Sequence, residues 1–252
     1  MRLFWSIVAV LCSGLFPELC YAGSSAIQLF SGPAVSVWDL FPNQDNVFGL
    51  GKKGSVVQVP SPNGKQKLEF PSDGGEDDDT YTFFAVVGRH RYPIKIDGYV
   101  DPHVIWANDS SGALFTFSNG GANGGWETKL LSFYGEHVDF TDPTQQIADD
   151  FIAYRDKVGI KCEVPHEFPN LYPIGFTDRS HALIAAETVG HSICDCFGSF
   201  RAYAIELPSG KIQKSLSQAR VKKIFGDKLP FDLSADPNDD WDVDPRSCAL
   251  KH

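Results

Sequence analysis

Carboxylates gather between Asp73 and Asp79, where five of the seven consecutive positions are Asp or Glu. Carboxylate oxygens are the hard ligands that Ca²⁺ prefers, but the spacing does not match the D-x-D-x-D-G loop of a calcium site. We therefore predict no metal here and interpret the run as a solvated hairpin tip. Asp77, Asp78 and Asp79 form a candidate binding surface, because clustered negative charge speeds encounter with a basic partner.

Cysteines are the second group with possible chemistry. Once an N-terminal export signal is removed, four remain: Cys162, Cys194, Cys196 and Cys248. An even number in an exported chain predicts disulfide bonds. A bridge between Cys194 and Cys196 would close a strained ring, so we predict two bridges, each joining one of this pair to Cys162 or Cys248. Each bridge should stabilise the fold by about 2–4 kcal/mol.

Zinc is the competing hypothesis for the same region. His166 follows Cys162 by four positions and His191 precedes Cys194 by three, and both thiolates and imidazoles bind zinc. Neither segment has two cysteines separated by two residues, the spacing typical of a zinc knuckle. Oxidation outside the cytoplasm also competes with thiolate ligation. We therefore expect no metal and no other cofactor.

No local catalytic signature is present: the sequence contains no G-x-S-x-G, H-E-x-x-H or S-x-x-K motif, and its histidines are scattered singly. We expect a non-enzymatic binding or scaffold protein whose partner is another protein. Trp126, after the Gly-rich run Asn119–Gly125, is a candidate aromatic anchor. Two alternatives stay open. One is an inhibitor or immunity protein for a basic enzyme, and the other is a hydrolase whose residues converge only in three dimensions.

The N-terminus has the features of a secretory signal peptide. Arg2 precedes an apolar run, Leu3–Phe16, that is too short to span a bilayer, and Ala22 precedes Gly23 as the small residue of a cleavage site. We predict a signal peptide over residues 1–22 and a periplasmic or extracellular location in the bacterial cell envelope. No second apolar run approaches membrane-spanning length, so we expect no membrane insertion.

The formal net charge is −10, and it stays −10 without the signal peptide because Arg2 and Glu18 cancel. An acidic chain of this kind repels nucleic acid and anionic lipid at long range. Basic or neutral partners are therefore favoured. The oligomeric state does not follow from the sequence.

Alternating apolar residues predict the elements that carry these side chains. Residues 104–106 and 113–117 read as two strands around the polar turn Asn108–Gly112. The same pattern, strand, turn and strand, recurs at residues 56–70 and 174–185. Aligning Gly64, Ser110 and Ser180 of the three turns gives spacings of 46 and 70 residues. The first spacing suits one four-stranded blade, and the second suits a blade with an insertion.

Two of these turns, Trp106–Ser110 and Ser61–Lys65, resemble the aromatic-Ser-Pro-Asp-Gly/Ser turn of TolB-type β-propeller blades. The chain is similar in this respect to a group of exported bacterial proteins built on such repeats. The resemblance implies an all-β, propeller-like stack of antiparallel sheets, either an incomplete propeller or an open stack. Gly23–Gly54 should add an edge strand to the first sheet.

Two short helices should interrupt this β-domain, which we place at residues 23–235. Asp142 supplies an N-cap for a helix over about 142–158, and Ser217 caps a second helix over about 217–225. Residues 236–252 are acidic and lack periodicity, so we expect an irregular tail tethered by a disulfide bond.

Overall fold

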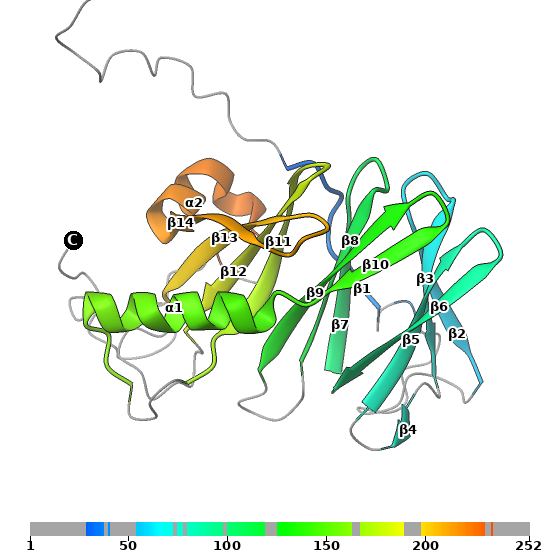
Figure 1. Cartoon of the computed structure of the whole chain (residues 1–252), viewed down its shortest axis with the longest axis horizontal. Helices are drawn as coiled ribbons and strands as arrows, with labels where there is room; N and C mark the ends of the chain where they lie inside the picture. The colour runs from blue at the N-terminus through cyan, green and yellow to red at the C-terminus, as the bar shows by residue number, and fades with distance from the viewer. Residues whose placement is uncertain are drawn as a thin grey trace, which may run out of the picture.

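The computed structural model describes residues 29–37, 40, 54–72, 75–77, 80–97, 100–118, 125–162, 167–188, 198–229 and 233. Within these ranges the fold is all-β, with three antiparallel sheets and two short α-helices, as predicted (Figure 1). The predicted signal peptide and the acidic tail lie outside the described residues. No helix in the described ranges is long and apolar enough to cross a membrane.

Each sheet contains four strands that follow one another along the chain and pair antiparallel. The first sheet comprises β2 (Val56–Pro60), β3 (Gln66–Pro71), β5 (Thr80–Val87) and β6 (His90–Asp97). The second comprises β7 (Val100–Trp106), β8 (Gly112–Ser118), β9 (Trp126–Tyr134) and β10 (His137–Thr141). The third comprises β11 (Asn170–Asp178), β12 (His181–Glu187), β13 (Phe200–Glu206) and β14 (Ile212–Ser217).

Two shorter strands lie at the margins of the first two sheets. β4 (Gly75–Asp77) pairs with β5. β1 (Val35–Ser36) pairs with β7 through Val104 and His103, so the N-terminal segment borders the second sheet. The expectation that this segment joins the first sheet was wrong, because the backbone edge that it meets belongs to β7.

One apolar core lies between the first and second sheets. Alternate residues of β5 are buried in it, as the period of two in a half-buried strand predicts. The Phe83 ring contacts Phe70 of β3 and Phe115 of β8, with centroids 5.1 and 4.5 Å away. Each buried aromatic ring of this kind stabilises the fold by about 1.5–3 kcal/mol.

β8 is buried along its whole length because a sheet packs against each of its two faces. Phe115 and Phe117 belong to the core shared with the first sheet. Leu114 points the other way, into a second core that includes Phe176 and Tyr203 of the third sheet. The second sheet is therefore the middle layer of the stack.

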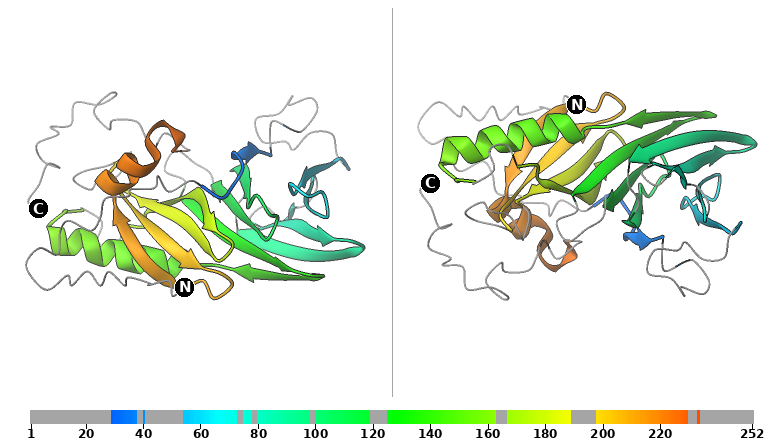
Figure 2. Two further views of the ribbon diagram at one scale, coloured as in Figure 1. Left: turned by 90° about the horizontal axis from the view of Figure 1, so that it is seen from above. Right: turned by 90° about the horizontal axis from the view of Figure 1, so that it is seen from below.

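Both predicted helices are present and lie on opposite sides of the third sheet (Figure 2). The N-cap of α1 (Thr144–Val158) is Pro143, without a side-chain cap hydrogen bond, so the predicted N-cap at Asp142 was wrong by one residue. Asp142 Oδ1 instead accepts a hydrogen bond from the Thr144 N–H at 3.0 Å, just before the helix. α2 (Gln218–Phe225) is capped by Ser217, whose Oγ accepts from the Arg220 N–H at 3.4 Å. A 3₁₀ turn, η2 (Gly226–Lys228), follows α2.

The three repeated turns join the first two strands of their sheets and form one row along an edge of the stack. Ser110 Oγ accepts the backbone N–H of Asn63 at 3.0 Å, which links the first turn to the second. Arg179 Nε contacts Asp109 Oδ2 at 2.7 Å, which links the third turn to the second. Ser110 has φ 65°, a left-handed conformation that non-glycine residues adopt mainly in turns. These contacts align consecutive sheets at one edge.

The two outer faces of the stack differ in what covers them: one has paired polar side chains and the other is partly covered by a helix. On the first sheet, Glu69 accepts a hydrogen bond from Gln58 at 3.1 Å and pairs with Lys67 and Arg91, each at 3.0 Å. On the third sheet, α2 covers part of the outer face with Val221 and other apolar residues. The described residues therefore form an open stack with a polar end and a helix-covered end, as in repeat proteins with capped ends.

Candidate binding site

Trp126 begins β9 and is half-buried where the second and third sheets meet. Its ring centroid lies 6.1 Å from that of His103 and 5.7 Å from that of Tyr172. Its backbone N–H donates to Asn170 Oδ1 at 3.0 Å, and Asn170 Nδ2 donates to the Tyr172 hydroxyl at 3.1 Å. Trp126 thus helps to join two sheets, and its role as a binding anchor stays a prediction.

Glu187, at the end of β12, lies next to this cluster. It stands opposite Asn170 and Phe200 in the paired strands, on the face that α2 covers. Burial raises the pKa of Glu187 to about 7, an effect that the nearby Lys222 ammonium only partly offsets. Its carboxyl forms no hydrogen bond or ion pair with another described residue. A carboxyl in this state can gain or lose a proton near neutral pH.

The predicted acidic surface lies mostly outside the described residues. Asp77 ends β4 and its side chain is not described, while Asp78 and Asp79 are themselves outside the described ranges. Most of the Gly-rich run, residues 119–124, is also outside them. The role of these loops stays a prediction.

Cys162, just after α1, is the one predicted disulfide residue that lies within the described ranges, and it is disulfide-bonded. Cys194, Cys196 and Cys248 lie outside these ranges, so the pairing stays a prediction. Both histidines of the zinc hypothesis are outside them too. Within the described part of the chain, no three His, Cys, Asp or Glu side chains come close enough to hold a metal ion.

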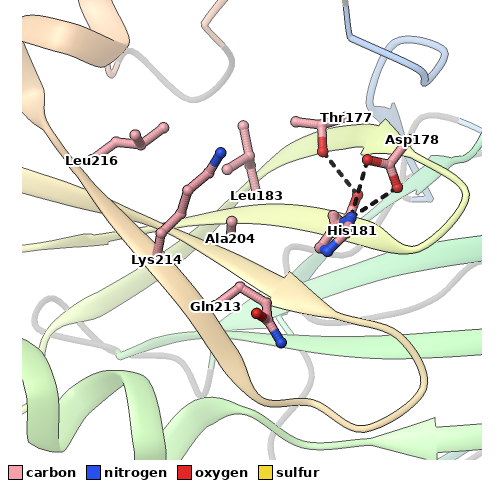
Figure 3. A pocket seen from close by; sticks show the side chains of 8 residues that line it. All are labelled: Thr177, Asp178, His181, Leu183, Ala204, Gln213, Lys214 and Leu216. Atoms are coloured by element: carbon pink, nitrogen blue, oxygen red, sulfur yellow. Dashed lines mark hydrogen bonds and ion pairs between the residues drawn. The ribbon is translucent and has the colours of Figure 1, made fainter.

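A hollow of about 510 Å³ opens on the outer face of the third sheet (Figure 3). Its floor is apolar and consists of Leu183 on β12, Ala204 on β13 and Leu216 on β14. Leu183 pairs with Ala204 in the sheet register, and Ala202, two residues earlier on the same face, pairs with Leu216. The three floor residues therefore point to one side.

Polar groups stand on opposite sides of this floor. At the β11–β12 turn, His181 Nδ1 lies 2.9 Å from Asp178 Oδ1. Across the floor stands Lys214 of β14 (Figure 3), whose ammonium has no hydrogen-bond or ion-pair partner among the described residues. Thr177 and Gln213 complete the lining.

The carboxylate of Asp178 is stabilised in its ionised form. Burial acts to raise the pKa of Asp178, but hydrogen bonds from the Ser180 N–H and from His181 outweigh it, and the pKa is lowered. Asp178 therefore remains a charged partner for His181 through the neutral pH range. Within the described ranges, the His181 ring bonds to the Asp178 carboxylate, and no Ser, Thr or Cys side chain bonds to it.

Two buried cations elsewhere have structural roles. Lys129 of β9 contacts Glu127 at 2.6 Å and Asp142 at 2.5 Å, which joins the second sheet to the start of α1. Arg155 of α1 donates to the Glu167 carbonyl at 2.5 Å, which joins the helix to the segment before β11. Buried charges with such partners stabilise local geometry rather than form open sites.

Sequence reasoning selected none of the residues that line the hollow. They are ordinary strand and turn residues spread over positions 177–216, and only the sheet register brings them together. One sequence signal could have indicated the hollow: Lys214 lies two positions before Leu216. On a strand, this spacing places a charged and an apolar side chain on the same face. A comparison of the chain with protein-family models, curated proteins and solved structures found no match.

Proposed function

We propose that this chain is an exported, non-enzymatic binding protein that holds another protein against the third sheet. The observation that carries the proposal is the hollow, where an apolar floor lies between the Asp178–His181 pair and the Lys214 ammonium, which has no partner among the described residues. Exposed apolar surface combined with a few convergent polar groups is typical of binding sites.

The shape of the site favours a macromolecular partner. The hollow lies on an open sheet face, and its lining comes from strands β11 to β14 and the turn between the first two of them. A segment of another protein can place one side chain on such a floor while its backbone crosses the sheet. The predicted export signal would place the encounter in the periplasm or outside the cell.

No observation in the described residues specifically favours either alternative, the inhibitor or immunity protein or the hydrolase. An inhibitor of a basic enzyme requires an acidic surface, and the acidic run at Asp73–Asp79 lies largely outside the described residues. A hydrolase requires a nucleophile near a base, and His181 has none among the described side chains.

Site-specific photo-crosslinking tests the proposal. A photoreactive amino acid replaces Gln213 at the hollow in one variant, and it replaces the exposed Lys95 of the first sheet in a control variant. Both are expressed in cells that export the protein. We expect a discrete crosslinked protein at position 213 and none at position 95, and we expect Ala204→Glu to reduce the crosslink. No crosslink at 213, or the same product at both positions, would contradict the proposal.

A further inference from the structure

Cations gather in the segment that runs from β13 through α2, beside the hollow. Residues 198–229 carry seven Lys and Arg side chains and two Asp and Glu side chains, although the whole chain has a net charge of −10. Five of the seven cations are exposed, and we call them the basic surface: Lys211, Lys214, Arg220, Lys223 and Lys228.

The described residues provide no counter-ion for the basic surface, as is also true of the exposed Lys65, Lys95 and Lys157 on other elements. None of its five side chains forms an ion pair with a described residue. By contrast, Lys67, Arg91, Lys129 and Arg179 each contact a carboxylate within 3.0 Å. Uncompensated charge next to an apolar hollow is available to a partner of opposite sign.

We propose that the basic surface and the hollow together bind an acidic peptide segment of the partner protein. Carboxylates of the segment contact Lys214, Arg220 and Lys223, and an apolar side chain between them covers Leu183 and Leu216. This inference rests on the proposed function and names the chemical class of the partner. It also departs from the expectation, drawn from net charge, that basic or neutral partners are favoured.

Local charge outweighs net charge at this site for a physical reason. At physiological ionic strength, exposed charges are screened beyond about 8 Å. A bound segment therefore responds to the charges that it contacts, which are the cations of the basic surface and, at the far side of the hollow, the Asp178 carboxylate that His181 partly offsets. It responds much less to the carboxylates of the first sheet. A long polyanion or an anionic membrane would extend beyond the basic surface and meet the acidic remainder of the molecule, so a short segment fits better.

Fluorescence anisotropy with the complete mature protein tests the inference. The probe is a short labelled peptide that alternates Glu with Leu, and its counterpart has Gln in place of every Glu. The test variant is Lys214→Gln/Arg220→Gln/Lys223→Gln. The matched control, Lys65→Gln/Lys95→Gln/Lys157→Gln, removes the same charge from exposed sites on other elements. The mature protein keeps its acidic residues 236–252. If these residues occupy the basic surface, the peptide must displace them in order to bind.

We expect the Glu peptide to bind the wild-type protein more tightly at low salt than at high salt. The test variant should lose about tenfold in affinity, the sum of three modest charge contacts, and the control less than about twofold. If thermal melting shows that the triple variant is unfolded, Lys214→Gln alone should lose about twofold to threefold.

Three results would overturn the inference: equal losses in the test and control variants, equal binding of the Gln peptide, or tighter binding to phosphatidylglycerol vesicles than to the Glu peptide. The last result would indicate a lipid-binding surface. If a protein crosslinks at position 213 but the Glu peptide does not bind, the proposed function stands and the inference that the partner segment is acidic is wrong.

Discussion

Replacing Glu187 with Gln should stabilise the protein at about pH 8 and leave its stability at about pH 4 unchanged. Burial raises the folded-state pKa of Glu187 from 4.5 to about 7. A carboxyl with a raised pKa contributes its full stability below the unfolded-state pKa, and that contribution is lost as pH rises through the folded-state pKa. Above about pH 7 the protein must hold a largely buried carboxylate beside Phe200, with no hydrogen-bond or ion-pair partner among the described residues.

The size of the effect follows from the shift. One pKa unit corresponds to about 1.4 kcal/mol, so the shift sets an upper limit of about 3 kcal/mol. Water penetration and movement of Lys222 reduce this, and we expect the variant to gain about 1–3 kcal/mol at about pH 8. For a chain of this length each kcal/mol raises the melting temperature by about 2–4 °C.

Urea unfolding of the wild type and of Glu187→Gln at both pH values measures the effect. Asp139→Asn, at an exposed position on β10, is the control and should show no comparable gain. An equal difference between variant and wild type at the two pH values would refute the reasoning, because it would mean that Glu187 does not change its protonation between them.

Three further predictions concern contacts between sheets and between a sheet and α1. Thr128→Val should cost about 1–3 kcal/mol in urea unfolding, because it removes the buried hydroxyl that donates to the Leu171 carbonyl at 2.8 Å. Gly112→Ala should cost about 1–3 kcal/mol in thermal melting, because the new Cβ would lie 3.0 Å from Phe176 Cε1. Asp142→Asn should cost about 1 kcal/mol at neutral pH, by weakening the contact with the buried lysine of β9. Hydrogen bonds outweigh burial and lower the pKa of Asp142, so this cost should disappear as pH falls below about 4.

Local patterns predicted the strands of the repeated hairpins well. Residues 104–106 and 113–117 lie within β7 and β8, and the polar residues between them form the turn. Strand alternation and turn residues act over a few positions, so they are visible without tertiary contacts. Among the later strands, Tyr81–Val87 was recognised and lies within β5, but β10 and β14 were not identified, because exposed residues at the margin of a sheet blur the alternation.

Helix caps were equally local signals. Ser217 caps α2 as predicted. For α1 the predicted cap was one residue off, because Pro143 is the N-cap and Asp142 accepts the Thr144 N–H from outside the helix. Capping involves residues two or three positions apart, so the spacing alone determines it. Both helices therefore begin and end within two residues of their predicted bounds.

The candidate site depended on contacts between distant residues. Leu183, Ala204 and Leu216 line one hollow because three strands pair in a particular register, and a shift of one residue would turn each strand's side chains to the other face. That no described carboxylate pairs with Lys214 likewise depends on where the fold places those carboxylates. The sequence by itself determined the all-β class, the repeated turns, the two helices and the net charge, because each depends on neighbouring residues or on composition. Only the tertiary structure decided that β1 joins the second sheet, that Trp126 packs between sheets and that the residues of the hollow lie on one face, because these depend on how separate strands pair and stack.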